Sequence, residues 1–514
     1  MNNIRIAFLT LLTAFVTSAS WAQAVQVGPG QTYLNIGDAA NARAVHPGDT
    51  VFVHAGTYSD ANTLIDSLIG TPDRWITIMP YENDSVSIHV QYTFQAAQYL
   101  KISGLNFYGN DRADSAQVFH LLFFDYQYAC FTSNHDIIIE NCTFSDLNNT
   151  GKGNTGACLK IDGTANFQVL NCTFRDGTNI TDGISLNADS NGLVSHCLFQ
   201  NMPGDGSHCK GGAKNIVYEQ NRFINCIADG VDVGGDTGPQ FFCPLGATWE
   251  ADSIMVYANV FIGGLTGIRL SSCHHAFIFN NTCFKTTSFA FRSLNTSVPT
   301  ITLDSNYVYN NIFTTYSVNH IYLNASDPFN YSTEYFKNNL FHDYLFADPD
   351  SISWLELPGV NVSGSLIGDP DFTDTSNGDF SLRAGSPAIG KGFATQEPVT
   401  DYLGMPYSLT ARSIGAFEAQ AASVSPVASA GTFFIAPNPC GNSLTLFLGG
   451  AVQPSEIRVL DVLGREVMRI AMPPNSNAEP IPINTDALVD GEYTLLARAS
   501  NGDLLGRQNF VRMR

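Results

Sequence analysis

Charged residues are scarce in this sequence of 514 residues, and basic residues are the scarcer kind. Only 14% of the side chains are charged, and 25 Lys and Arg stand against 46 Asp and Glu, which gives a formal net charge of −21. Such an acidic surface argues against nucleic acid and anionic lipid as partners. An anionic substrate would therefore need a local group of basic residues.

Long apolar runs are absent after the first 24 residues, so the rest of the sequence predicts no membrane span. Residues 1–24 combine Arg5, an apolar run from Ile6 to Val16 and a small-residue end, Ala22-Gln23-Ala24. This order is typical of a cleaved signal peptide, with a membrane anchor as the alternative. Cleavage would remove Arg5 alone among the charged residues and leave 24 basic against 46 acidic residues, a net charge of −22.

The cysteine count is odd, so the eleven cysteines cannot all pair within one chain. Cys142, Cys172 and Cys197 each precede a recurring Phe by two residues. This spacing favours a column of small buried side chains over a disulfide scheme.

Glycine and asparagine are abundant instead, with 44 Gly, and this composition favours turns and strands over exposed helices. A β-rich run with an Asn near its end and a closing Phe recurs every 23 to 38 residues, ending at Phe144, Phe174, Phe199, Phe223, Phe261, Phe284, Phe313 and Phe341. Stacked coils of this kind would form a continuous core and let Asn side chains bond from coil to coil. Leucine-rich repeats need regular Leu spacing and propeller blades a period of about 40 residues. The sequence therefore predicts an all-β fold, a parallel β-helix with Phe144, Phe174, Phe199 and Phe223 stacked inside.

The two ends of the repeat region resemble those of secreted right-handed β-helix proteins. "VHPGDTVFVHAGTYSD" (45–60) resembles their opening coil, and residues 368–392 and "SIGAFE" (413–418) resemble their closing coils. The resemblance places a right-handed β-helix over residues 25–418. In the closing segment, Asp369, Asp371 and Asp374 are interpreted as turn residues in preference to a calcium loop.

A second domain follows a linker of small residues and Pro at 419–430. Residues 431–514 alternate strands with Gly, Asn and Asp turns, which predicts a small β-sandwich. "PNP" (437–439), the turn from Asp461 to Arg465, "GEY" (491–493) and the basic end resemble the sorting domain of the type IX secretion system. The resemblance implies a Bacteroidetes-type bacterium, passage through the periplasm and outer membrane, and a secreted or cell-surface protein. A carbohydrate-binding or fibronectin-like module is the alternative.

Two Asp-Gly steps, Asp205-Gly206 and Asp229-Gly230, lie 24 residues apart, which is the length of one coil. Residues one coil apart lie about 4.8 Å from each other, and side chains along a strand alternate inward and outward. Aligning "TGACLK", "DGISLN", "DGSHCK", "DGVDVG" and "TGIRLS" on Gly places Ile184, Val231 and Ile268 inside. The outward columns are then Thr155, Asp182, Asp205, Asp229, Thr266; Cys158, Ser185, His208, Asp232, Arg269; and Lys160, Asn187, Lys210, Gly234, Ser271.

Carboxylates stacked on adjoining coils repel one another unless they are protonated, paired with a cation or bound to a metal. Oxygen ligands without thiols favour calcium. Asx turns at each corner of the coil are the structural alternative, which is strongest for Asp182 and weaker for Asp229 with Asp232.

"DGSHCK", "ADGVDV" and "TGIRL" on consecutive coils resemble the site of the calcium-dependent pectate lyases of polysaccharide lyase family 9. The resemblance implies calcium ligands at Asp205, Asp229 and Asp232, with Asp182 beside them, and places Arg269 where the family has its Brønsted base. Two positions depart from the pattern: Ala228 stands for a paired Asp, and Arg269 for Lys.

Other residues of this face are candidates for the remaining roles. Arginine is a poor base near neutral pH, so Arg269 could act only as a charge clamp and Lys210 is the substitute base. Lys160 and His208 could contact the substrate, although His208 also fits a simple surface position. Trp249, in the long insertion from Asp236 to Asp252, could stack on a sugar ring or cover the edge of the core.

Three functions fit these patterns. The first is a secreted polysaccharide lyase that cleaves an acidic, uronate-containing glycan by calcium-assisted β-elimination. The second is a glycoside hydrolase with paired Asp residues, since neighbouring coils supply the carboxyl separations of about 5 Å or 6.5–9.5 Å that hydrolases use. The third is a glycan-binding β-helix without catalysis. The mature chain is expected to act as a monomer.

Overall fold

The computed structural model describes two compact units, residues 1–419 and 420–514, each taken by itself. The described residues are 22–59, 63–109, 120–125, 133–148, 156–294, 303–316, 331–345 and 360–419 of the first unit, and 433–436, 442–448, 454–461, 466–472, 481–489, 491–499 and 504–512 of the second. The predicted signal peptide lies almost wholly outside them. Among the described residues no helix has the length and apolarity to cross a membrane, and the α-helix α1 (Ile36–Asn41) has six residues.

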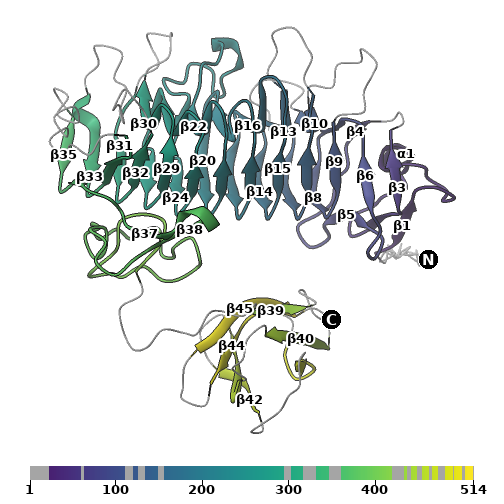
Figure 1. Ribbon diagram of the computed structural model, residues 1–514. Coiled ribbons are helices and arrows are strands. Elements are labelled where there is room, and N and C mark those ends of the chain that lie inside the picture. Colours follow the sequence, from purple (N-terminus) through teal and green to yellow (C-terminus); the bar gives the residue numbers. More distant parts are fainter. Residues whose placement is uncertain are drawn as a thin grey trace, which may run out of the picture. The chain divides into compact units, whose positions relative to one another are not determined.

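The first unit is a parallel β-helix, in which each coil adds one strand to each of three sheets (Figure 1). In order along the described residues, sheet A consists of β1 (Ala24–Val27), β2 (Thr50–Val53), β5 (Ile76–Pro80), β8 (Gln98–Ser103), β11 (His135–Glu140), β14 (Ala165–Leu170), β17 (Ser190–Ser195), β20 (Ala213–Glu219), β24 (Met255–Tyr257), β28 (Phe277–Phe279), β31 (Asn306–Tyr309), β33 (Glu334–Lys337) and β35 (Asn361–Ser363), with the short strands β23 (Ala251–Asp252) and β27 (Cys273–His274) beside them. Sheet B consists of β3 (Gly56–Tyr58), β6 (Val86–Ile88), β9 (Asn106–Tyr108), β12 (Thr143–Ser145), β15 (Thr173–Arg175), β18 (Leu198–Gln200), β21 (Arg222–Ile224), β25 (Val260–Ile262), β29 (Thr282–Thr286), β32 (Ile312–Thr315), β34 (Leu340–Asp343) and β36 (Leu366–Ile367). Sheet C, which carries the predicted site, consists of β4 (Leu64–Asp66), β7 (Tyr92–Gln95), β10 (His120–Asp125), β13 (Gly156–Asp162), β16 (Thr181–Asn187), β19 (Ser207–Lys210), β22 (Asp229–Gly234), β26 (Thr266–Ser271) and β30 (Phe289–Leu294).

A stack of Phe rings fills the interior behind sheet B, as predicted. Phe144, Phe174, Phe199 and Phe223 are nearly parallel, with ring centroids 4.5–4.9 Å apart. Phe107 and Phe261 extend the stack at its two ends, at 4.8 and 4.7 Å.

The stack ends where the repeat changes register by one residue. Cys283 pairs with Phe261 across β25 and β29, so Phe284 follows on the opposite face and packs edge-on against Phe380 at 4.9 Å. The Phe at the end of "FIFNNTCF" is therefore not a further member of the interior stack. Phe380 belongs to the closing segment, which carries the antiparallel pair β37 (Phe372–Asp374) and β38 (Asp379–Leu382) and the 3-10 helix η4 (Thr375–Asn377).

Asparagines bond from coil to coil at one corner, also as predicted. Each amide Nδ2 donates to the Oδ1 of the next coil at 3.0 Å, through Asn221, Asn259, Asn281, Asn311 and Asn339. Cys142, Cys172 and Cys197 lie at the equivalent position of the earlier coils, buried, and Cys197 donates to the carbonyl of Val169. Burial raises the pKa of the Cys142 and Cys172 thiols, which agrees with inert core residues.

The second unit has two antiparallel sheets around a separate core. One sheet has the order β39 (Phe433–Ala436), β40 (Ser443–Leu448), β43 (Ile481–Asn484), and the other β42 (Glu466–Ala471), β41 (Glu456–Asp461), β44 (Gly491–Arg498), β45 (Leu504–Arg512). Leu446, Val459, Ile483 and Leu495, from both sheets, are buried in that core. The remaining 3-10 helices, η1 (Pro239–Phe241) and η2 (Tyr331–Thr333), belong to the first unit.

Candidate functional site

The Asp-Gly steps start the strands of sheet C because glycine allows the closest approach between coils. A Cβ on Gly206 would lie 2.5 Å from the carbonyl oxygen of Gly230 and 2.5 Å from the ring of Phe223. Gly230 has the same relation to Gly267 and Phe261. The Asp before each Gly is consequently held at the same point of every coil.

The register of β16, β19, β22 and β26 is the one predicted. Ser185, His208, Asp232 and Arg269 pair in succession, and so do Asn187 with Lys210 and Gly234 with Ser271. Ile184, Val231 and Ile268 are buried inside, as expected.

The register predicted for the coil of β13 is wrong by two residues. Ala157 pairs with Asp182 and Lys160 with Ser185, so Lys160 belongs to the column of His208, Asp232 and Arg269, and Asp162 takes the place beside Asn187. Lys160 stays on the outer face because the shift is an even number of residues. Cys158, predicted to face outward, falls at the position of Gly183 and is buried in the core. Thr155, aligned to Asp182 from the sequence, lies outside the described residues.

Asp182 and Asp205 each use one carboxylate oxygen to bind the backbone of the next coil. Asp182 Oδ1 accepts the amide of Asp205 at 2.8 Å, and Asp205 Oδ1 accepts the amide of Asp229 at 3.2 Å. Each Asp can therefore bind the backbone at the corner of the coil through Oδ1 and still present Oδ2 on the outer face of sheet C.

Asp205, Asp229 and Asp232 converge. Each offers a carboxylate oxygen, and these oxygens lie within 4.8 Å of one another. Arg269 borders the cluster on the next coil, with Nη1 3.0 Å from Asp229 Oδ2 and Nε 3.5 Å from Asp232 Oδ2. Asp232 Oδ1 is buried and has no hydrogen-bond partner in the part of the chain that the structure describes.

Burial makes these carboxyl groups reluctant to ionise. It raises the pKa of Asp232 to about 7, against the attraction of Arg269. It raises the pKa values of Asp205 and Asp229 to about 6, and the neighbouring carboxylate of Asp205 adds to the shift at Asp229. The neighbouring carboxylate of Asp232 raises the pKa of the Arg269 guanidinium, so Arg269 stays protonated and positively charged. A further cation in the cluster would favour the ionised carboxylates.

Asp182, Asp205 and His208 form a second group on the adjoining coils. His208 Nδ1 lies 3.5 Å from Asp182 Oδ2 and 3.4 Å from Asp205 Oδ2, and His208 Nε2 lies 2.9 Å from Ser185 Oγ. Burial lowers the pKa of His208, and it raises the pKa of Asp182. His208 is therefore a neutral, buried member of the site and not a solvated surface residue.

The two lysines differ in their surroundings. Lys160 Nζ forms an ion pair with Asp162 at 3.0 Å and lies 3.4 Å from Ser185 Oγ. Lys210 forms no ion pair with any described residue, and its stem runs along Gly235, where a Cβ would lie 2.7 Å from Lys210 Cδ. Lys210 is the freer of the two amines.

The insertion after β22 is joined to the turn after β19 by Glu250, which sequence reasoning did not single out. The buried carboxylate of Glu250 accepts the amides of Gly211 at 2.9 Å and Thr237 at 2.7 Å. Trp249, next to it, packs against His274 of sheet A, with ring centroids 5.7 Å apart. Phe241 is half exposed and Phe242 is buried.

The residues present suit a hard divalent cation. The converging groups are three carboxylates, and one oxygen of Asp232 is orphaned, which is the chemistry that calcium prefers. The thiols of Cys209 and Cys226 are buried in the core and the side chain of Ala228 has no ligand atom, so the groups that could hold such a cation are the carboxylates of Asp205, Asp229 and Asp232.

Comparisons with known proteins agree on the fold. The family of right-handed β-helix regions matches residues 88–241, which confirms the predicted fold class. The secretion system C-terminal sorting domain matches residues 434–507. The chain is therefore secreted by the type IX system to the cell surface or the extracellular space. A comparison with curated proteins finds no match.

Several solved structures are similar to this chain at low sequence identity. The pectate lyase Pel9A is 16% identical with a TM-score of 0.45, and the alignment covers 78% of this chain and 97% of that one. The GH136 lacto-N-biosidase from Eubacterium ramulus is 11% identical with a TM-score of 0.41, over 68% and 67% of the two chains. The PL6 family alginate lyase AlyGC is 14% identical with a TM-score of 0.37, over 80% and 60%.

Proposed function

We propose that the β-helix is a secreted polysaccharide lyase that acts as a monomer and cleaves a uronate-containing glycan by calcium-assisted β-elimination. The observation that carries the proposal is the carboxylate of Asp232, which converges with those of Asp205 and Asp229 and whose buried Oδ1 has no hydrogen-bond partner among the described residues. Such an oxygen costs free energy unless a cation or a donor meets it.

The distribution of basic residues supports an anionic substrate. The chain has 25 Lys and Arg among 514 residues, yet Lys160, Lys210 and Arg269 all stand on the outer face of three strands of sheet C. The acidic cluster stands on the same face, and in this charged strip the three cations would attract a polyanion once a bound cation offsets the carboxylates.

Calcium held by Asp205, Asp229 and Asp232 would neutralise the carboxylate of the uronate and so acidify its C5 proton. In its neutral form the amine of Lys210, the freer of the two lysines, would accept that proton. The electrons of the C5–H bond form the C4=C5 double bond as the C4–O bond breaks, and the departing oxygen takes a proton from solvent. Arg269 would hold the substrate carboxylate as a charge clamp, since its raised pKa makes it unfit as a base.

The direct test is the ultraviolet absorbance of unsaturated uronate products, measured on acidic glycans with and without a chelator. A lyase produces an increase that the chelator abolishes and that added calcium restores. New reducing ends without this absorbance would indicate hydrolysis, and retention of the glycan without either product would indicate binding alone; both results would contradict the proposal.

One observation favours a glycoside hydrolase as the second candidate. Asp232, with a pKa of about 7, could remain protonated as a general acid while Asp205 or Asp229 serves as the other carboxylate. A hydrolase of this kind would be indifferent to chelator, whereas the proposed lyase needs the metal.

A further inference from the structure

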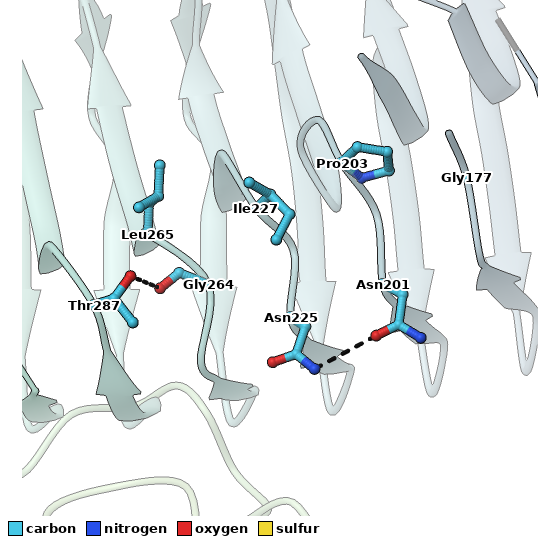
Figure 2. Close-up of a pocket in the computed structure, with 8 residues that line it drawn as sticks. All are labelled: Gly177, Asn201, Pro203, Asn225, Ile227, Gly264, Leu265 and Thr287. Atoms are coloured by element: carbon cyan, nitrogen blue, oxygen red, sulfur yellow. Dashed lines mark hydrogen bonds between the residues drawn. The ribbon is translucent and has the colours of Figure 1, made fainter. Parts of the chain in front are cut away.

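An apolar ledge runs beside the charged strip, at the corner between sheets B and C. Its residues line a pocket of about 550 Å³: Gly177, Asn201, Pro203, Asn225, Ile227, Gly264, Leu265 and Thr287. Pro203, Ile227 and Leu265 come from neighbouring coils and form a row (Figure 2). None of the eight residues is charged.

Two members of the row are largely exposed, and Pro203 is partly exposed. Ile227 is 50% and Leu265 46% exposed, and Ile180, at the same corner one coil before Pro203, is 61% exposed. Single exposed aliphatic residues are ordinary, but a row on successive coils marks a binding surface. Gly264 keeps the floor open, because its φ is +75° and a Cβ there would lie 2.2 Å from the carbonyl oxygen of Cys226.

The ledge is continuous with the acidic cluster. Pro203 and Ile227 each lie two residues before an Asp of the cluster, Asp205 and Asp229. Two residues of extended chain span about 7 Å. A group joined directly to a uronate at the cluster can therefore reach the ledge, and the two surfaces can hold neighbouring parts of one ligand.

Amide groups form the lower edge of the ledge. Asn225 Nδ2 donates to Asn201 Oδ1 at 3.4 Å, and both side chains are exposed (Figure 2). Amides bind hydroxyl groups, while the aliphatic row suits C–H groups. The pocket volume lies within the usual range for small-ligand sites and far exceeds what an acetyl group would fill.

We infer that the ledge binds an uncharged sugar joined to the uronate, so that the substrate is a heteroglycan of neighbouring uronate and neutral sugars. This inference rests on the proposed function. A homopolymer of uronates would instead bring a second carboxylate against Ile227 and Leu265, where no lining residue offers a cation to offset its desolvation.

The test compares two polymers on the full-length protein: an unesterified polyuronate, and a polymer that alternates uronate with a neutral 6-deoxyhexose. Unsaturated product and retardation in affinity gels are both measured for the wild type and for Ile227→Asn and Leu265→Asn. Leu403→Asn is the matched control, since Leu403 is 66% exposed in the closing segment. Circular dichroism checks that each variant is folded.

The alternating polymer should be cleaved and retained better than the polyuronate, and each ledge variant should reduce that preference about tenfold. A wild-type preference for the polyuronate, or an unchanged preference in both ledge variants, would overturn the inference. If neither polymer yields unsaturated product, the proposed lyase activity fails, and the gels still decide the inference by whether Ile227→Asn weakens retention of the alternating polymer specifically.

Discussion

Arg269 contacts one carboxylate oxygen of Asp232, and the other oxygen of Asp232 is not bound by it. Arg269 Nε lies 3.5 Å from Asp232 Oδ2, while Asp232 Oδ1 is buried and has no partner among the residues that the structure describes. The guanidinium also lies 3.0 Å from Asp229, so a single arginine pairs with two carboxylates. Asp205 lies 3.4 Å from the neutral His208 and forms no ion pair with a Lys or Arg among the described residues. The cluster is short of positive charge at its centre.

Replacing Asp232 tests whether the acidic cluster binds a cation. Asp232→Asn should lower calcium affinity at least about tenfold, because a charged ligand is lost. Without calcium the variant should be no less stable than the wild type near neutral pH, since a buried carboxylate with a raised pKa is removed. Isothermal titration calorimetry and calcium-dependent melting measure the two effects. Asp66→Asn, at an exposed position, is the control, and equal calcium affinity in Asp232→Asn and wild type would contradict the ligand assignment.

Lys210 and Arg269 should be separable by their variants. Lys210→Ala should reduce turnover about a hundredfold or more, because the amine is expected to accept the C5 proton. Its calcium affinity should stay within a few fold of that of the wild type. Arg269→Ala should also weaken turnover, and without calcium it should destabilise the fold, since Asp229 and Asp232 lose their shared partner. Turnover and thermal melting distinguish the two.

Lys214→Ala is the matched control for the lysine, because Lys214 pairs with Asp252 on the neighbouring sheet. Full activity of Lys210→Ala would remove Lys210 as the base. Full activity of Arg269→Ala would exclude a role for Arg269 in holding the substrate carboxylate.

Calcium affinity should rise with pH across the range in which the cluster ionises. The free carboxyl groups have pKa values of about 6 for Asp205 and Asp229 and about 7 for Asp232, above the ordinary value near 3.9. The folded protein without metal thus holds more protons than the unfolded chain between about pH 4 and 7, and its stability falls as pH rises through that window. Calcium needs the ionised forms, so its affinity should climb over the same window and level off above about pH 8. Calorimetry near pH 6.5 in buffers of different ionisation enthalpy should show proton release, and a pH-independent affinity would refute the cluster as the site.

The sequence was sufficient to predict the fold and most of the register of the site. The recurring Phe and Asn positions define one coil, and the Asp-Gly steps align β16, β19, β22 and β26 as the structure has them. The alignment failed at β13 because "TGACLK" has a Gly two residues away from the equivalent of Gly183, and nothing in a period-2 pattern distinguishes registers that differ by two.

Other features could not be predicted because they depend on contacts between distant residues. Glu250 lies 39 residues from the Gly211 amide that it accepts, and no local signal marks a buried carboxylate that binds backbone. The ledge of Pro203, Ile227 and Leu265 looks like ordinary coil corners in the sequence, and its exposure is evident only once the coils are stacked. A search for apolar residues one or two positions before each Asp-Gly or Thr-Gly step could have found it, since Pro203 and Ile227 lie two positions before Asp205 and Asp229, and Leu265 lies one position before Thr266.

Glu334, on β33 and away from the acidic cluster, should make the β-helix less stable as pH rises. Its side chain is buried, and Oε1 accepts a hydrogen bond from Asn306 Nδ2 at 2.9 Å, whereas Oε2 has no partner within the described ranges. Burial raises the pKa of Glu334 to about 8. Because the folded pKa lies above the unfolded value near 4.3, the protonated form is favoured by folding, and stability is lost progressively from about pH 4 to 8. Glu334→Gln keeps the acceptor and removes the charge, so its advantage in unfolding free energy should be small at pH 4 and grow to the order of 1–3 kcal/mol by pH 9. Chemical denaturation at both pH values measures this, with the exposed Glu82→Gln as control; an advantage that is the same at both pH values would show that Glu334 does not ionise in this range.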